Sequence, residues 1–212
     1  MVTIWIVRKE RFSVAKDFLA AVKERRSIYA ISKEQVASDD RIQEIINEAV
    51  KHTPSAFNSQ SARVVVLLGE QHDKLWDLTT DILKAIVPAD QFESTAQRMN
   101  GFRSGYGTVL FFEDVETIDG LKAQFPPYQD RFDTWSHHSS GMLQFVVWTS
   151  LENEGFGASL QHYNPLIDEK VQAEWNVPAT WRLVAQLPFG NVVAPAGDKE
   201  FKPLDERIKV YK

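Results

Sequence analysis

The sequence contains no cysteine among its 212 residues. This absence excludes disulfide bonds, thiolate catalysis, and zinc or iron–sulfur sites that cysteine would ligate. The patterns G-x-G-x-x-G and G-x-x-x-x-G-K-[ST] are also missing, which excludes the common dinucleotide turn and the P-loop phosphate cradle. Neither H-E-x-x-H nor G-x-S-x-G occurs, so we expect no metal site, and only a scattered serine and histidine arrangement is left for a hydrolase.

An excess of basic residues and a long apolar run are absent as well. The net charge of −5 and the pI near 5.6 argue against nucleic acid or an anionic membrane as the main partner. No apolar run approaches the length that spans a bilayer, and the opening MVTIWIVRKERF reverses the order of a secretory signal. We therefore expect a cytoplasmic protein without a nucleic-acid or membrane partner. Its length and its 43% apolar content suit one sizeable globular domain.

Hydrophobic periodicity predicts helices that alternate with short apolar strands. Ser13 and Ser38 are candidate caps for the first two helices, and the second carries the apolar stripe Ile42, Ile45, Ile46 and Ala49. Further helices are expected at about 75–86, 88–101, 136–154 and 165–175. Strands are expected at 63–68, 108–112 and 181–187, and a weak one, without an obvious partner, near 208–210. Helix 136–154 is apolar around most of its circumference, which indicates a central or interface helix. This pattern favours a single layered α+β or α/β architecture.

A polar loop at 55–61 is the most informative segment of the chain. It follows a helix and leads directly into an apolar strand, and it contains Ser55, Asn58 and Gln60. Loops between rigid elements often carry binding groups. Asparagine and glutamine offer a paired donor and acceptor, which suits the edge of a flat heterocycle. An ordinary turn is the alternative, because serine, asparagine and proline are also common turn residues.

Three other segments carry possible ligand-binding groups. Arg25, Arg26 and Ser27 follow the first helix and suit phosphate oxygens, although cations at a helix C-terminus are also favourable on their own. Segment 155–165 has glycines that let the backbone approach a ligand, followed by polar side chains that can touch it. The third segment, 188–207, is a cation-bearing coil for which a solvated tail is an equal alternative.

Taken together, the segments ERRSIYAIS, HTPSAFNSQSARVVVLLG, SGYGTVLFFED, HSSGMLQFVVW, GFGASLQHYNP and PFG…PAG…K-x-F-x-P resemble the FMN-dependent nitroreductase family. The likeness is greatest to the compact branch of fungal and bacterial proteins. It leaves residues 1–12 as an N-terminal extension and makes 13–212 a nitroreductase-like FMN-binding domain. The resemblance implies an α+β three-layer fold with a central, mostly antiparallel sheet. It also implies a homodimer that exchanges a C-terminal strand and holds FMN at the interface.

The resemblance further implies roles for individual residues. Arg25, Arg26 and Ser27 would hold the FMN phosphate and ribityl chain, with Lys199 near the phosphate. The partner subunit would supply Ser55, Asn58 and Gln60 to the flavin. Gln144 matches a glutamine on the interface helix, and the backbone at Leu160, Gln161 and His162 matches the loop that faces flavin N5. Larger relatives carry an arginine where this chain has Phe201, and Lys202 or Arg207 is a possible replacement.

The function that follows from this resemblance is transfer of hydride from NAD(P)H through flavin N5 to a nitroaromatic or quinone acceptor, by a ping-pong exchange. The cofactor carries the organic chemistry, so no side chain is named as a catalytic acid or base. The alternative is a flavin-binding redox-regulatory or interaction protein whose turnover is incidental. Steady oxidation of NADH or NADPH with an acceptor distinguishes the enzyme from this alternative.

Overall fold

The computed structural model of the chain describes residues 17–212. The expected Ser13 cap and the N-terminal extension 1–12 lie outside the described residues. Helix α1 (Phe18–Glu24) begins after Asp17, whose carboxylate accepts hydrogen bonds from the backbone N–H groups of Leu19 and Ala20. This local cap fixes the start of the helix two turns before Arg25 and Arg26.

A five-stranded sheet lies at the centre of the described chain. Its strands are β1 (Ile31–Ser32), β2 (Ala62–Leu68), β3 (Gly107–Asp114), β4 (Phe156–Ala158) and β5 (Trp181–Val192). The order is β1-β5-β3-β2, with β4 also paired to β5, and every strand pair is antiparallel. All eight residues of β3 are buried because β2 and β5 flank it and helices cover both of its faces. The three strands expected from apolar runs are confirmed.

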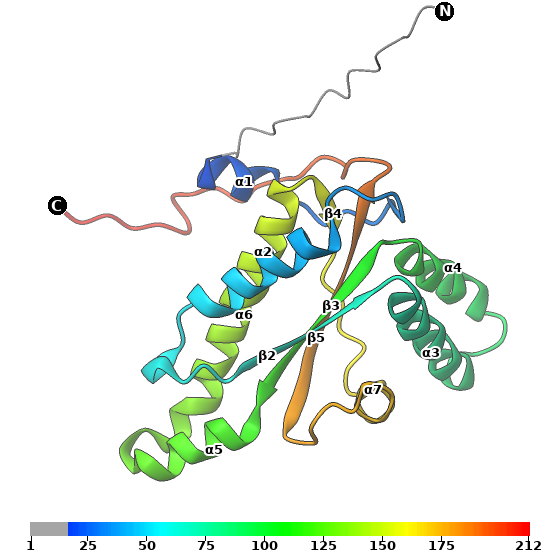
Figure 1. Cartoon of the computed structure of the whole chain (residues 1–212). Coiled ribbons are helices and arrows are strands. Elements are labelled where there is room, and N and C mark those ends of the chain that lie inside the picture. Colours follow the sequence, from blue (N-terminus) through cyan, green and yellow to red (C-terminus); the bar gives the residue numbers. More distant parts are fainter. Residues whose placement is uncertain (1–16) are drawn as a thin grey trace, which may run out of the picture.

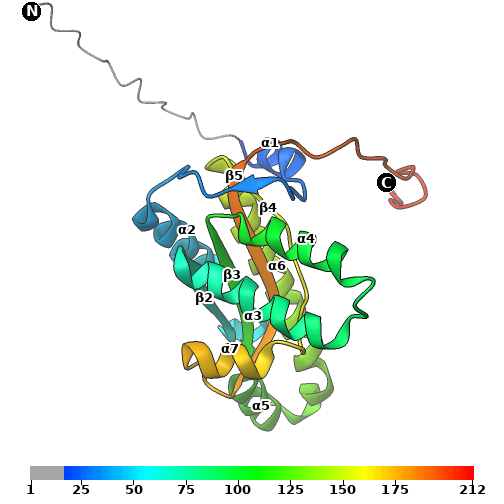
Figure 2. The ribbon, with the colours of Figure 1, turned by 90° about the vertical axis from the view of Figure 1, so that its right-hand side faces the viewer.

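Helices cover both faces of this sheet, so the three-layer α+β fold is confirmed (Figures 1 and 2). Helices α2 (Asp39–His52) and α6 (Phe132–Asn153) pack on one face, around Val109 and Phe111 of β3. Helices α3 (Glu70–Ile86), α4 (Phe92–Arg103) and α7 (Asp168–Trp175) cover the other, around Leu110 and Phe112. Because side chains alternate along β3, this strand contributes residues to two separate hydrophobic cores.

Helix α2 follows its sequence signals closely. Ser38 Oγ accepts a hydrogen bond from the backbone N–H of Arg41, and the acidic pair that opens the helix suits its positive end. The four apolar residues of the predicted stripe are all buried, and three of them, Ile42, Ile46 and Ala49, pack in one core with α6 and the sheet. The long α6 ends before Gly155, whose φ of +98° is a backbone conformation that glycine adopts without strain.

Several element boundaries differ from the sequence predictions. Helix α6 begins at Phe132, four residues before the expected start at Ser136. Helix α4 begins at Phe92 and continues through Gly101, and α7 begins at Asp168, after a cis peptide bond between Asn164 and Pro165. Helix α5 (Val115–Gln124) and the 3-10 helices η1 (Ala56–Asn58) and η2 (Pro126–Arg131) were not predicted.

The C-terminal tail also departs from its expected structure. Residues 193–212 form no helix or strand in the described chain, and Ile208 and Val210 are exposed. Within the single described chain no strand forms near 208–210, because no neighbouring strand bonds this backbone, and the exchange of a C-terminal strand between two subunits stays a prediction. None of the helices within residues 17–212 is long and apolar enough to cross a membrane.

Candidate functional site

A pocket of about 610 Å³ lies between the end of α1 and the segment that follows β5. Arg25, Arg26 and Ser27 line one wall and Lys199 lies on the other, so the structure brings these four predicted residues together. Arg26 Nη2 donates a hydrogen bond of 2.8 Å to the carbonyl oxygen of Gly197, which joins the two walls. The pocket is therefore built from the two ends of the described chain and carries three cationic side chains.

Arg25 has a buried donor that its surroundings leave unpaired. Its guanidinium carbon lies 4.2 Å from the ring centroid of Trp148 on α6. Its buried Nε has no hydrogen-bond partner within residues 17–212. Burial and the neighbouring Arg26 charge lower the pKa of Arg25, while Glu152 acts in the opposite direction. A bound anion would offset the repulsion between the two arginines, and the unpaired donor of Arg25 adds to the positive potential, so the pocket fits a phosphate group.

The backbone after β4 runs beside this pocket. Ser27 forms a β-bridge with Ala158, and Ile28 N–H donates to the Ala158 carbonyl at 2.9 Å. The predicted residues Leu160, Gln161 and His162 follow directly. Gln161 pairs through both of its backbone groups with Gln186 of β5, at 2.7 and 2.9 Å, which fixes the path of this segment. His162 is exposed. The structure thus places segment 160–162 on the same side of the fold as the arginines.

The polar loop after α2 lies away from the basic pocket. Figure 1 shows α1 and β4 at one end of α2 and α6, whereas the loop that contains Ser55, Asn58 and Gln60 is at the other end. None of these three residues lines the basic pocket. A single chain therefore does not bring the two groups together, and the assignment of this loop to a second subunit stays a prediction.

The polar loop has an unusual backbone. Phe57, Asn58 and Gln60 have φ values of 56°, 50° and 48°, and Asn176 is the only other non-glycine residue with positive φ in the described chain. Such conformations cost roughly 1 kcal/mol or more for each non-glycine residue. Ser55 Oγ offsets part of this cost by accepting a 2.9 Å hydrogen bond from the Gln60 N–H. Clusters of such residues are typical of functional loops.

Phe57 was not singled out in the sequence, although an aromatic residue inside a polar loop is a usable signal. Its ring is half exposed, and it packs against four other aromatic side chains at centroid distances of 4.8 to 5.9 Å: Phe125, Tyr128, Phe132 and Trp135. A shallow apolar pocket of about 400 Å³ lies between Phe57 and the first turns of α6. The loop thus presents polar groups beside an aromatic surface.

The last two predicted residues lie apart from the basic pocket. Gln144 is buried in the middle of α6, where its Nε2 donates to Ser140 Oγ at 3.0 Å. Arg207 is exposed in the tail, and neither Arg207 nor Lys202 lines the pocket. In this single chain neither cation replaces the family arginine at the Phe201 position.

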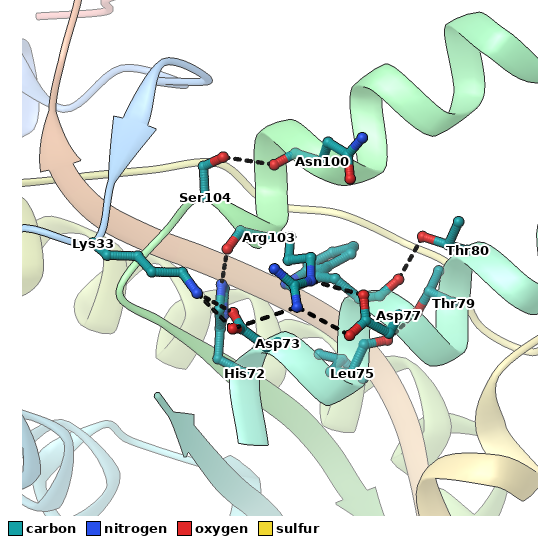
Figure 3. Close-up of polar contacts among 11 residues, drawn as sticks. Lys33, His72, Asp73, Leu75, Asp77, Thr79, Thr80, Asn100, Arg103 and Ser104 are labelled. Carbon is teal, nitrogen blue, oxygen red and sulfur yellow. Dashed lines mark hydrogen bonds and ion pairs between the residues drawn. The ribbon is translucent and has the colours of Figure 1, made fainter. Parts of the chain in front are cut away.

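A second polar cluster lies on the opposite face of the sheet, where α3 meets α4 (Figure 3). Lys33 Nζ contacts both carboxylate oxygens of Asp73 at 2.6 and 2.5 Å, and Arg103 donates to Asp77 at 2.7 Å. Behind these pairs, His72 is fully buried, and burial lowers its pKa to about 4. Within residues 17–212, no group of histidine and acidic residues could hold a metal ion. We assign this cluster a structural role, because its ion pairs join the end of β1 to α3 and α4.

The chain belongs to the nitroreductase family, and it is therefore an oxidoreductase by class. The model of that family matches residues 22–191, which include the arginines, the polar loop and the segment after β4. HBN1 of Saccharomyces cerevisiae is 37% identical over 199 residues, which cover 92% of this chain and 98% of HBN1.

Solved structures agree with this assignment. Nitroreductase CinD from Lactococcus lactis, in complex with nicotinic acid, is 44% identical with a TM-score of 0.86, and covers 92% of this chain and 100% of its own. CinD has also been solved with chloramphenicol and with 4-nitrophenol. A structure from Desulfovibrio desulfuricans in complex with FMN shares the fold at 20% identity and a TM-score of 0.64, over 93% of this chain and 98% of its own.

Proposed function

We propose that this protein is an FMN-dependent oxidoreductase that passes hydride from NADH or NADPH to nitroaromatic or quinone acceptors by a ping-pong exchange. The observation that carries the proposal is the basic pocket, in which Arg25 keeps a buried donor without a partner beside Arg26, Ser27 and Lys199. The membership of the chain in the nitroreductase family and the FMN bound in the Desulfovibrio structure support the choice of cofactor.

The residues of this chain would bind and orient the cofactor. Arg25, Arg26 and Lys199 neutralise the phosphate, and Ser27 adds a hydroxyl donor. The pairing of Gln161 with β5 uses both of its backbone groups and holds segment 160–162 in place, so the backbone groups of Leu160 and His162 are the ones that would face the ring system. When bound, FMN accepts and returns hydride at N5. The protein then needs no acid or base of its own and supplies orientation and electrostatics.

We further propose that two copies of the chain complete each site. The polar loop lies at the far end of α2 and α6 from the basic pocket, so its amide groups can reach the same flavin only from a second subunit. Helix α6 leaves Met142 and Phe145 exposed, and the tail leaves Phe201 and Tyr211 exposed. Burial of such apolar groups is the usual driving force for a homodimer interface.

Nitroaromatic acceptors fit the aromatic surface around Phe57. Five aromatic rings meet there beside polar loop groups, and flat aromatic ligands stack favourably on such rings. The two CinD complexes with nitroaromatic compounds, chloramphenicol and 4-nitrophenol, support the same acceptor class for this chain.

Removal of Arg25 tests the cofactor assignment. A hydrogen bond to a charged group contributes roughly 1.5–3 kcal/mol, so we expect Arg25→Ala to weaken FMN binding roughly tenfold to a hundredfold while the protein stays folded. Titration of the flavin-free protein with FMN, followed by flavin fluorescence, measures this change. The matched control is Arg98→Ala, which removes an exposed arginine from α4 on the other face of the sheet.

Equal FMN affinity in Arg25→Ala and wild type would remove Arg25 from the site. A preparation that binds no FMN from excess would refute the cofactor itself. Steady oxidation of NADH or NADPH with 4-nitrophenol or a quinone supports the enzyme. Tight FMN binding with negligible turnover across such acceptors would instead favour a flavin-binding regulatory protein.

A further inference from the structure

Glu113, near the end of β3, is a fully buried carboxyl group that the proposed chemistry does not use. It follows Val109 and Phe111 on the sheet face that α6 covers. Its Oε2 accepts two hydrogen bonds, from Ser61 Oγ at 2.6 Å and from Ser136 Oγ at 2.8 Å. Ser61 is the last residue of the polar loop and Ser136 lies in the first turns of α6. One carboxyl group therefore joins three elements that are distant in the sequence.

Burial of Glu113 disfavours its charged form. Its Oε1 is buried and has no hydrogen-bond partner among the described residues. Burial raises the pKa of Glu113, while the two serine hydroxyls and the more distant Arg182 and His137 act in the opposite direction. No cation forms an ion pair with it within residues 17–212. A buried carboxyl group without an ion-pair partner is costly, and this cost calls for a role beyond filling space.

The polar loop needs an anchor at its C-terminal end, where Ser61 lies. Three of its residues hold left-handed backbone conformations, and such strain persists only where the surroundings over-determine the structure. The Glu113–Ser61 hydrogen bond is buried, and the Asp114 N–H donates to the Ser61 carbonyl at 2.9 Å. Arg63 adds a 2.6 Å hydrogen bond to the Gln60 carbonyl while it pairs with Asp114. Among the described residues, only the bond to Glu113 ties the side chain of Ser61 into the core.

We propose that Glu113 is a positioning residue, which holds the strained polar loop against α6 so that Ser55, Asn58 and Gln60 are preorganised for the flavin. This inference rests on the proposed function for the role of the loop. Glu113 is thereby added to the residues that shape the proposed site, although it contacts no ligand itself. The same carboxyl group also contacts the first turns of α6 through Ser136, so it links the polar loop, which carries Phe57, to the helix that carries Trp135.

Four variants test this role. Glu113→Gln keeps a neutral acceptor of the same shape, whereas Glu113→Leu removes both hydrogen bonds. Ser61→Ala removes only the bond to the loop and serves if Glu113→Leu fails to fold. The matched control is Thr108→Val on the same strand, which breaks buried hydrogen bonds to His72 and Trp76 on the opposite face. It lowers stability by the same mechanism without touching the loop.

Two readouts separate this inference from the proposed function. The first is amide hydrogen exchange of a peptide that covers 55–63, measured without flavin. The second is the FMN affinity of each variant. We expect Glu113→Leu and Ser61→Ala to speed exchange in this peptide and to weaken FMN binding about tenfold, the size that follows from the loss of one or two neutral hydrogen bonds. Glu113→Gln should behave as wild type, and Thr108→Val should lower the melting temperature only.

Each other outcome has one meaning. If amide exchange in 55–63 were as slow as in wild type in both Glu113→Leu and Ser61→Ala, the anchoring role would be overturned, whatever the FMN affinity of these variants. Faster exchange with unchanged FMN affinity would overturn the link between the anchor and the flavin. An equal loss of FMN affinity in Thr108→Val would mean that Glu113 affects FMN binding only through the overall stability of the fold, and it would overturn the proposal. If the wild type itself bound no FMN, the proposed function would fail while the exchange readout still judged the anchor.

Discussion

Mild acid should destabilise this protein through a single buried imidazole, His72. Its two ring nitrogens both have partners. Trp76 Nε1 donates to Thr108 Oγ1 at 3.0 Å, so the threonine hydroxyl is free to donate to His72 Nδ1 at 2.8 Å. His72 Nε2 then carries the hydrogen and donates to the Arg103 carbonyl at 3.2 Å. This chain of contacts is complete with a neutral imidazole and has no place for a second ring proton.

The size of the effect follows from the pKa of His72. Burial lowers it from 6.5 to about 4 in the folded protein. Because the folded pKa is depressed, the unfolded chain takes up the proton first as the pH falls. The stability from the neutral imidazole is therefore fully present above the unfolded pKa of 6.5 and is lost progressively toward pH 4. Between pH 7 and pH 5 the loss amounts to about 2 kcal/mol, and it reaches about 3 kcal/mol below pH 4.

Urea unfolding at pH 7, 6 and 5, followed by circular dichroism at one protein concentration, measures this loss. Glu113 and Asp168 have raised pKa values because they are buried, and they oppose the effect of His72. The informative quantity is therefore the difference in pH slope between wild type and His72→Gln. We expect His72→Gln to be less stable at pH 7 but to lose about 2 kcal/mol less than wild type between pH 7 and pH 5.

The control is His52→Gln, which makes the same substitution at an exposed position of α2. Identical pH slopes in wild type and His72→Gln would refute the reasoning. They would mean that His72 is protonated in the folded protein or exchanges freely with solvent.

Two further predictions concern the packing of the fold. A Cβ atom at Gly190 would lie 2.5 Å from the Ser32 carbonyl oxygen, so Gly190→Ala should cost about 1–3 kcal/mol, whereas Gly101→Ala, with open space around it, should gain up to about 1 kcal/mol. Equal melting temperatures of Gly190→Ala and wild type in thermal denaturation would contradict this prediction. Leu151→Ala opens a cavity in the core beneath α6 and should lower the free energy of unfolding by about 2–5 kcal/mol. The exposed Ile86→Ala should lower it by almost nothing. Equal losses of unfolding free energy in urea would count against the packing described.

The parts of this fold that sequence predicts well are those fixed by near neighbours. Ser38 and the isoleucines of α2 act within a few turns, so the cap and the buried face both appear as expected. The apolar runs of β2, β3 and β5 read directly as strands. Arg25 was a candidate phosphate ligand from its residue type and Lys199 from the family resemblance, and the fold places them in one pocket.

The features that sequence did not predict depend on distant partners. The left-handed backbone at Phe57 goes with a side chain that packs against four aromatic rings from the region 125–135, about 70 positions later in the chain. The burial of Glu113 requires a serine 52 positions earlier and another 23 positions later. The tail strand was expected from alternation and from the resemblance to a strand-exchanging homodimer, and a single chain does not supply the neighbouring strand that such a β-structure needs.

The arrangement of the basic pocket has a consequence for how the protein matures. One wall comes from residues 25–30 and the other from residues 194–199, so after the first wall a ribosome must still translate residues 31–199 before both walls exist. A nascent chain can fold α2 and the first strands early, but it cannot clasp an anion between Arg26 and Lys199. An anion held between these two walls therefore meets a chain that has already been synthesised from Arg25 through Lys199.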